Sequence, residues 1–317
     1  MMRKRQSGSI LILSLWMLFF LAALTVASVG HAVSVLQTAR HLQSRVAARM
    51  DAVSTASLVA AVIAEQIHDN DGETNVWDGV AADAWNRDES LFVQPSEMAR
   101  DRGEVQPVYF TMPEEETYGG VVGEGGRLHL NANSPDVLRQ LFRYVGGDEG
   151  EAVARQLFHD RDETNLEEQN DDTKERPKFS AIEDLLLEDG VDTELFSGLL
   201  PHLTVYGDGA VLNINSATRP VLVAYFMAYG EDDVRDAESI ADALLAARAE
   251  RSFESWDDFN ERIDGVDRDM WSRGPMGVSS TAFRGIATGV DVSGEVSLEI
   301  EFVWDGETGQ FVLWREL

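Results

Sequence analysis

A run of 21 residues without a charged side chain, residues 9–29, constrains this chain more than any other feature. As an α-helix with a rise of about 1.5 Å per residue, the run is roughly 30 Å long, the thickness of a bilayer core. Arg3, Lys4 and Arg5 precede it. Because basic residues stay on the cytoplasmic side, we expect a single-pass inner-membrane protein with a cytoplasmic N-terminus and a periplasmic main body.

Three interpretations of the run remain open. A cleaved signal peptide has a shorter apolar run and a small-residue cleavage site, which are not found here. A plain membrane anchor needs only the run itself. In the third, the helix continues beyond the membrane as far as Ile67, because no proline or glycine follows Gly30 before His68 and apolar residues recur at helical spacing. The expected apolar face of that helix contains Val46, Met50, Val53, Ala60 and Ile67.

Composition excludes several classes of function. The chain has 56 acidic and 26 basic residues and a formal net charge of −30, which argues against nucleic-acid binding because phosphates would be repelled. The absence of cysteine excludes disulfides, thiol catalysis and cysteine zinc sites. The sequence has no metalloprotease, nucleophile-elbow or phosphate-loop motif. His129 and His202 lie in apolar surroundings, so we expect packed histidines and no enzyme, with an unrecognised catalytic site as the alternative.

A weak internal repeat organises the middle of the chain. Residues 130–138 read LNANSPDVL, and residues 212–222 repeat this pattern with two more residues in total. Asn or Ser before an apolar run is typical of a helix N-cap. A DNA-binding helix-hairpin-helix is the rival interpretation, but its turn at residues 229–234 is acidic and would repel phosphate. The expected helices are residues 136–144, 148–158, 180–187, 192–200, 219–229, 236–248 and 255–262.

The C-terminal residues alternate in the manner of β-strands. Residues 295–304 place apolar side chains on one face and mostly polar ones on the other, and residues 310–315 return after a glycine-containing turn. Residues 283–290 form a further expected strand. The hairpin needs an apolar partner, and we expect it to pack on the soluble part of the long helix, against the apolar face at residues 46–53.

An acidic segment follows the helix expected at residues 148–158. Seven carboxylates fall within residues 160–172, and Ca²⁺ takes six to eight oxygen ligands from flexible loops. The alternative is a solvated acidic loop, and the spacing is not that of an EF-hand because the required glycine is missing. The candidate calcium ligands are Asp160, Asp162, Glu163, Asn165, Asp171 and Asp172.

The short basic leader that ends in Gly8, followed by a half-apolar helix, resembles the type IV pilin and pseudopilin class. The resemblance implies that a prepilin peptidase cleaves between Gly8 and Ser9 and methylates the new amine. Most members carry Glu at the fifth mature position, which here is Leu13. An unpaired carboxylate is costly in lipid, so its absence is expected of a subunit with no neighbour above it. One branch shares this departure, the K-type minor pseudopilins of type II secretion.

The order of several further segments is similar to that branch. The resemblance implies a small sheet interrupted by a large helical domain, and calcium in the acidic segment. The Gly-Ala-Glu that often follows the family's Asp-x-Asp is replaced at residues 169–171, which leaves the ligand assignment open. The segments that carry the resemblance are residues 160–162, 176–187, 200–209, 212–216 and 277–280.

We therefore predict an α+β fold, with a long N-terminal pilin helix on a small antiparallel sheet and an inserted all-α domain of helix-hairpin-like modules. The implied function is a minor pseudopilin at the tip of the type II pseudopilus, joined to other minor pseudopilins and the major pseudopilin, and touching secreted proteins or the outer-membrane channel. An anchored periplasmic binding or scaffold protein is the alternative. The predicted parts are a leader (1–8), a transmembrane half-helix (9–29), a periplasmic half-helix (30–68), a first α/β part (69–130), the inserted domain (131–275) and the last strands (276–317).

Overall fold

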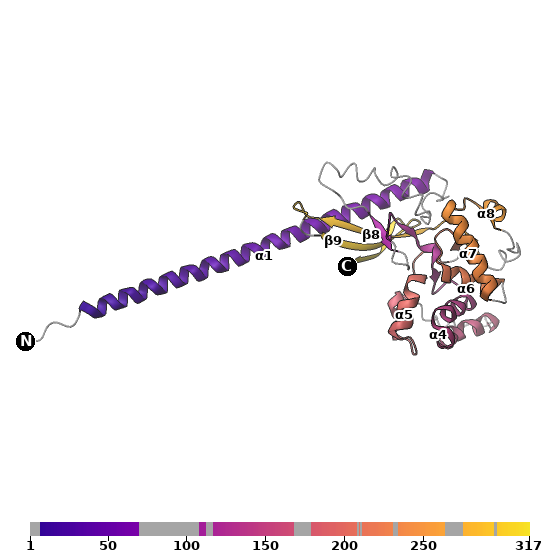
Figure 1. Cartoon of the computed structure of the whole chain (residues 1–317), viewed down its shortest axis with the longest axis horizontal. Coiled ribbons are helices and arrows are strands. Elements are labelled where there is room, and N and C mark those ends of the chain that lie inside the picture. Colours follow the sequence, from indigo (N-terminus) through magenta and orange to yellow (C-terminus); the bar gives the residue numbers. More distant parts are fainter. Residues whose placement is uncertain are drawn as a thin grey trace, which may run out of the picture.

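The computed structural model describes residues 7–69, 108–111, 117–167, 179–207, 209, 211–230, 234–263, 275–294 and 297–317. A long helix projects from the rest of the molecule, a small sheet lies along the far half of this helix, and a group of shorter helices lies beyond the sheet (Figure 1). The predicted α+β fold with its long N-terminal helix is confirmed. The bounds of the six predicted parts stay predictions.

The long helix is a single element, α1 (Ser7–Asp69), of 63 residues. No break occurs at Gly30, which lies inside the helix with open space around it. Within the described part of the chain, α1 is the one helix long and apolar enough to cross a membrane, and its apolar window is entirely unburied in the molecule. The same rod therefore serves as a single-pass anchor at one end and as part of the folded body at the other.

The sheet is antiparallel throughout and has the order β10-β9-β8-β1-β2, with β3 paired to β8 beyond the end of β1. Alternation predicts which face is buried, since Leu298, Ile300, Phe302 and Trp304 all lie on the α1 side. The strands are β1 (Tyr109–Thr111), β2 (Thr117–Gly119), β3 (Val122–Gly123), β8 (Ala282–Val290), β9 (Ser297–Asp305) and β10 (Gln310–Glu316).

The face of α1 that meets the sheet differs from the predicted one. Val46 and Met50 are 57% and 67% exposed, whereas Ala48, Ala52 and Ala56 are fully buried. The reason is a glycine on β8: a Cβ added to Gly289 would lie 2.0 Å from the Ala48 carbonyl oxygen and 2.3 Å from the Ala52 nitrogen. The helix and strand backbones approach so closely that only the smallest side chains fit between them.

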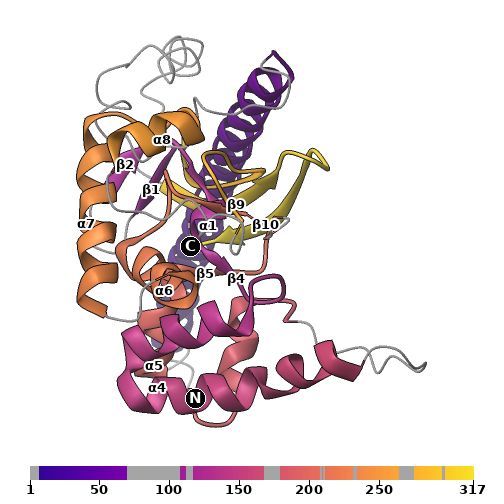
Figure 2. The ribbon, with the colours of Figure 1, turned by 90° about the vertical axis from the view of Figure 1, so that its right-hand side faces the viewer.

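Beyond the sheet, the two copies of the repeat build two similar modules (Figure 2). Each module begins with a two-residue strand, continues through helices, and ends with a second short strand that pairs in parallel with the first. The first module contains β4 (Leu128–His129), α4 (Pro135–Glu167), η2 (Ile182–Leu187), α5 (Thr193–Leu199), η3 (Leu200–His202) and β5 (Leu203–Thr204). The second contains β6 (Leu212–Asn213), α6 (Arg219–Tyr229), α7 (Val234–Glu250), α8 (Trp256–Arg262) and β7 (Met276–Gly277).

The asparagines of the repeat do more than begin helices. Asn131 donates to the Phe179 carbonyl and accepts from the Phe179 amide, 2.8 and 3.0 Å away. Asn215 holds the backbone of Phe253 in the same way, at 2.9 and 2.8 Å. In each module a motif side chain therefore ties down a distant phenylalanine segment by satisfying both of its backbone groups.

The expected N-caps are confirmed in one copy only. In the first copy, Ser134 Oγ accepts from the Val137 amide at 3.4 Å. In the second, the two additional residues move the helix start to Thr218, whose side chain makes no capping bond. The predicted cap at Ser255 is present, with Oγ accepting from the Asp258 amide at 3.3 Å.

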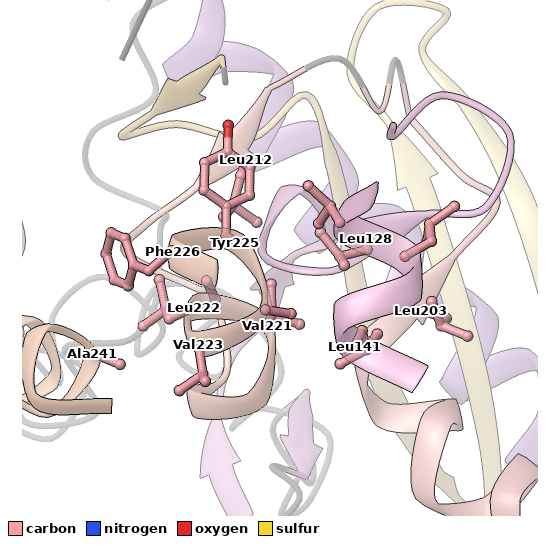
Figure 3. Packing of buried hydrophobic residues seen from close by; sticks show 14 of the residues in the cluster. Leu128, Leu141, Leu203, Leu212, Val221, Leu222, Val223, Tyr225, Phe226 and Ala241 are labelled. Atoms are coloured by element: carbon pink, nitrogen blue, oxygen red, sulfur yellow. The ribbon is translucent and has the colours of Figure 1, made fainter. Parts of the chain in front are cut away.

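The two modules share one hydrophobic core (Figure 3). Leu128, Leu141 and Leu203 of the first module face Leu212 and Val221 of the second, and all five are at most 2% exposed. Because neither module encloses an apolar interior by itself, the pair forms one body, and we call it the helical body.

Candidate assembly surface on α1

An apolar stripe runs along α1 on the side away from the sheet. Its side chains follow one another at steps of seven, four, four and three residues, which keeps them on nearly one side of a helix with 3.6 residues per turn. Exposed apolar side chains gathered in this way outside a membrane mark a surface for another protein. We call the set the α1 stripe: Val35, Leu42, Val46, Met50 and Val53, which are 36–67% exposed.

The charges of the chain are segregated along the same rod. No acidic residue precedes Asp51, so all 56 lie at or after this position in the sequence, whereas residues 31–49 carry three arginines. Arg49 Nε contacts Glu316 Oε1 of β10 at 2.7 Å, and Asp51 Oδ2 accepts from the Val290 amide at 3.1 Å. These contacts attach the folded body to α1 at the point where the fully exposed part of the helix ends.

A buried ionic network joins the sheet to the helical body on the face opposite α1. Arg284 on β8 donates to Glu124 Oε1 at 2.5 Å and to Glu301 Oε1 at 2.6 Å. Arg315 on β10 donates to the other oxygen of Glu301, and also to Glu183 of the helical body at 3.0 Å. Charged pairs with this many hydrogen bonds tolerate burial, but removal of one partner leaves an uncompensated charge.

The network stays ionised across the physiological pH range. Burial raises the pKa of the Glu124 carboxyl, but the positive charges of Arg284 and Arg127 outweigh this effect and hold the pKa at about 2. The same balance between burial and Arg284 lowers the pKa of Glu301. The two carboxylates therefore act as fixed negative charges at the junction and not as proton donors or acceptors near neutral pH.

Two histidines are buried, and one of them is neutral at pH 7. His129 and His202 are 7% and 6% exposed, as their apolar surroundings predict. His202 Nδ1 lies 2.8 Å from Thr218 Oγ1. Burial and, to a smaller extent, the positive charge of Arg127 lower the pKa of His202 to about 4, so the ring is neutral at pH 7.

The predicted site residues lie in two separate parts of the chain, the start of α1 and the end of α4. Gly8, Ser9 and Leu13 are in the first turns of α1, at the end remote from the body, and the Leu13 side chain is 68% exposed. Where a loop was expected after Phe158, α4 continues to Glu167. Asp160, Asp162, Glu163 and Asn165 thus lie on a helix, while Asp171 and Asp172 fall outside the described residues.

Calcium binding therefore stays a prediction. Among the described residues, no group of three or more histidine and acidic side chains is arranged to hold a metal ion. Sequence reasoning also missed the ionic network, although its signal was present. Arg284 is the one charged residue of β8, and a charge at such a position indicates a buried partner.

Comparison with known proteins gives a structural likeness without a match in sequence. No family model matches the sequence, and a search of curated proteins finds no match. Among solved structures, the chain is similar to a chain of the GspK–GspI–GspJ complex from the type 2 secretion system of enterotoxigenic Escherichia coli. The identity is 15%, the TM-score is 0.44, and the alignment covers 80% of this chain and 99% of the other. The assignment that follows therefore rests on the helix, the sheet and the leader of this chain.

Proposed function

We propose that this protein is a minor pseudopilin of a type II secretion system. The observation that carries the proposal is α1 itself, one unbroken helix with a bare apolar end, a folded body at its other end and the unpartnered α1 stripe between them. The apolar end sits in the inner membrane with the N-terminus cytoplasmic and the body periplasmic. Prepilin peptidase cleaves after Gly8 and methylates Ser9, and the α1 stripe then packs against helices of other minor pseudopilins and of the major pseudopilin.

The tip of the pseudopilus is the proposed place of the subunit. Leu13 offers no carboxylate to the amine of a subunit above it, which fits a position with no such neighbour. The helical body lies beyond the sheet at the far end of the molecule (Figure 1), where it would obstruct a further subunit stacked on top. From this position the body would start assembly and meet exported proteins or the outer-membrane channel.

The proposed role is structural and not enzymatic. The carboxylates of Glu124 and Glu301 are committed to Arg284 and Arg315, and the buried His202 beside them is neutral. Calcium bound near Asp160 and Asp162 remains part of the proposal, as a means to neutralise the acidic residues at and beyond the end of α4.

Cysteine cross-linking tests the α1 stripe directly, because the natural chain has no cysteine. Val46→Cys lies on the stripe, and His41→Cys is a matched control: both positions are exposed, and five residues place them about 140° apart around the helix. The other pseudopilins of the system would each carry one cysteine on the corresponding helix. We expect disulfide-linked heterodimers in the periplasm with Val46→Cys and none with His41→Cys. Equal cross-linking from both positions would contradict a docking role for the stripe.

A further inference from the structure

A small cavity opens at the junction, beside the ionic network. Three segments meet there: the η1 turn (Glu124–Gly126) and Arg127, the loop that follows β5, and the loop that leads into β8. The cavity has a volume of about 130 Å³, space for roughly four water molecules at about 30 Å³ each. Its polar wall is formed by Glu124, Arg127, Thr204, Tyr206, Ser279 and Thr281.

Arg127 is a cation of this wall that stays outside the hydrogen bonds of the ionic network. Both oxygens of Glu124 are already engaged, by Arg284 at 2.5 and 3.3 Å and by the Thr204 hydroxyl. Arg127 Nε stays 3.8 Å from Glu124, beyond hydrogen-bond distance, while 18% of its side chain is exposed. Among the described residues, no hydrogen-bond acceptor contacts its guanidinium. An arginine with free donors in a mostly buried setting is a strong site for an oxyanion.

Hydroxyl donors lie in the same wall. Ser279 and Thr281 are partly buried, and within the described part of the chain their hydroxyls make no hydrogen bond. Burial and the positive charge of Arg284 lower the pKa of Arg127 to about 10, so the protonated guanidinium gains stability from a nearby negative charge.

We propose that this cavity binds a small oxyanion through the Arg127 guanidinium, with the Ser279 and Thr281 hydroxyls as further donors. The volume admits one sulfate, phosphate or carboxylate group and excludes anything as large as a nucleotide. The anion is either a free inorganic ion or a carboxylate presented by another protein chain. The proposal does not depend on the assembly role of α1, because the cavity lies on the other side of the sheet.

The test is anion binding to the full-length protein in neutral detergent, measured by isothermal titration calorimetry at low ionic strength. The probes are sodium sulfate, sodium acetate, and a short peptide with a free C-terminal carboxylate beside its amidated form. Sulfate binding alone identifies a free ion, and binding of only the free-carboxylate peptide identifies a presented carboxylate. Arg127→Gln should weaken the affinity for the bound probe more than tenfold, and Arg139→Gln, which removes a partly exposed guanidinium paired with Asp136 outside the cavity, should leave it unchanged.

Several results would overturn the proposal. One is an absence of binding by every probe, and another is equal affinity for the natural protein and Arg127→Gln, since either removes the guanidinium as the ligand. Asp208, between two glycines of the wall, lies outside the described residues. Binding that appears only in Asp208→Asn would also overturn the proposal, because the Asp208 carboxylate would then be the anion that Arg127 binds in the natural protein. Should Arg127→Gln not fold by circular dichroism, Thr281→Val replaces it as the probe, with a severalfold loss of affinity expected and no loss counting against the site.

Discussion

The close approach of β8 to α1 gives the sharpest prediction about stability. Replacement of Gly289 by alanine adds a Cβ that would lie 2.0 Å from one backbone atom of α1 and 2.3 Å from another. Neither atom can rotate away, so the helix or the strand must move. Overpacking of this kind costs typically 1–3 kcal/mol, and because backbone opposes backbone we expect about 3 kcal/mol for Gly289→Ala.

A second glycine on the same strand and the same face is a matched control. A Cβ on Gly285 would meet side-chain atoms of Val108 and Val121 at 2.9 Å and of Phe302 at 3.0 Å, which can adjust by a few tenths of an ångström. We expect Gly285→Ala to cost about 1 kcal/mol. The entropic advantage of alanine over glycine in the unfolded chain is the same at both positions, so the difference between the variants isolates the backbone clash.

Thermal unfolding of the full-length protein in detergent, followed by near-ultraviolet circular dichroism, measures both variants. For a folded unit of about 150–250 residues, 1 kcal/mol corresponds to roughly 2–4 °C in Tm. Gly289→Ala should therefore lower Tm by about 6–12 °C and Gly285→Ala by about 2–4 °C. A Gly289→Ala protein as stable as Gly285→Ala would refute the reasoning, because the backbone of α1 at Ala48 and Ala52 would then not be held against the strand backbone.

Three further predictions concern the junction and the acidic segment. Arg284→Met removes the buried cation that Glu124 and Glu301 share and should destabilise the protein by about 3–5 kcal/mol in urea unfolding at pH 7; a loss below 1 kcal/mol would contradict the network. The pKa of Glu124 is about 2 in the folded state and about 4.3 when unfolded, so its contribution is complete above pH 4.3 and disappears as the pH falls towards 2. Glu124→Gln should accordingly flatten the acid side of the Tm-against-pH curve, and an unchanged curve would exclude this carboxyl as its source. Calcium should raise the Tm of the natural protein but not that of Asp162→Asn. An equal rise in both proteins would show that Asp162 does not bind the ion.

The long helix and the terminal hairpin could be predicted because their signals are local. The uncharged run and the absence of helix breakers as far as His68 predict α1, and alternation from Leu298 to Trp304 predicts the buried face of β9. The repeat also indicates a pair of related modules. Each of these patterns depends on neighbours a few residues away, which the sequence displays directly.

The helix face in contact with the sheet could not be predicted in the same way. Val46 and Met50 are the more apolar choice, and hydrophobicity alone favours them over Ala48 and Ala52. The decisive residue is Gly289, more than 200 positions away, which admits a closer helix than any large side chain allows. Small residues at the contact also leave the larger ones free on the opposite face, where the proposed assembly surface lies.

The calcium ligands illustrate a different limit. Carboxylate density predicts that a cation would be favourable, but density does not specify a geometry. The backbone of α4 continues as a helix through Asp160, Asp162 and Glu163, where the prediction requires a flexible loop. The ionic network shows the converse, since Glu124, Arg284 and Glu301 are distant in sequence and only the strand register brings them together.

The mass of the mature N-terminus tests the central claim most directly. The measurement requires the protein to be made in cells that contain its own prepilin peptidase and then extracted from the membrane for intact and peptide mass spectrometry. The account predicts a chain that begins at Ser9 with one added methyl group. A chain that retains Met1, or one cleaved beyond residue 29, would contradict membership of a pilus and leave α1 as an ordinary anchor or a removed signal.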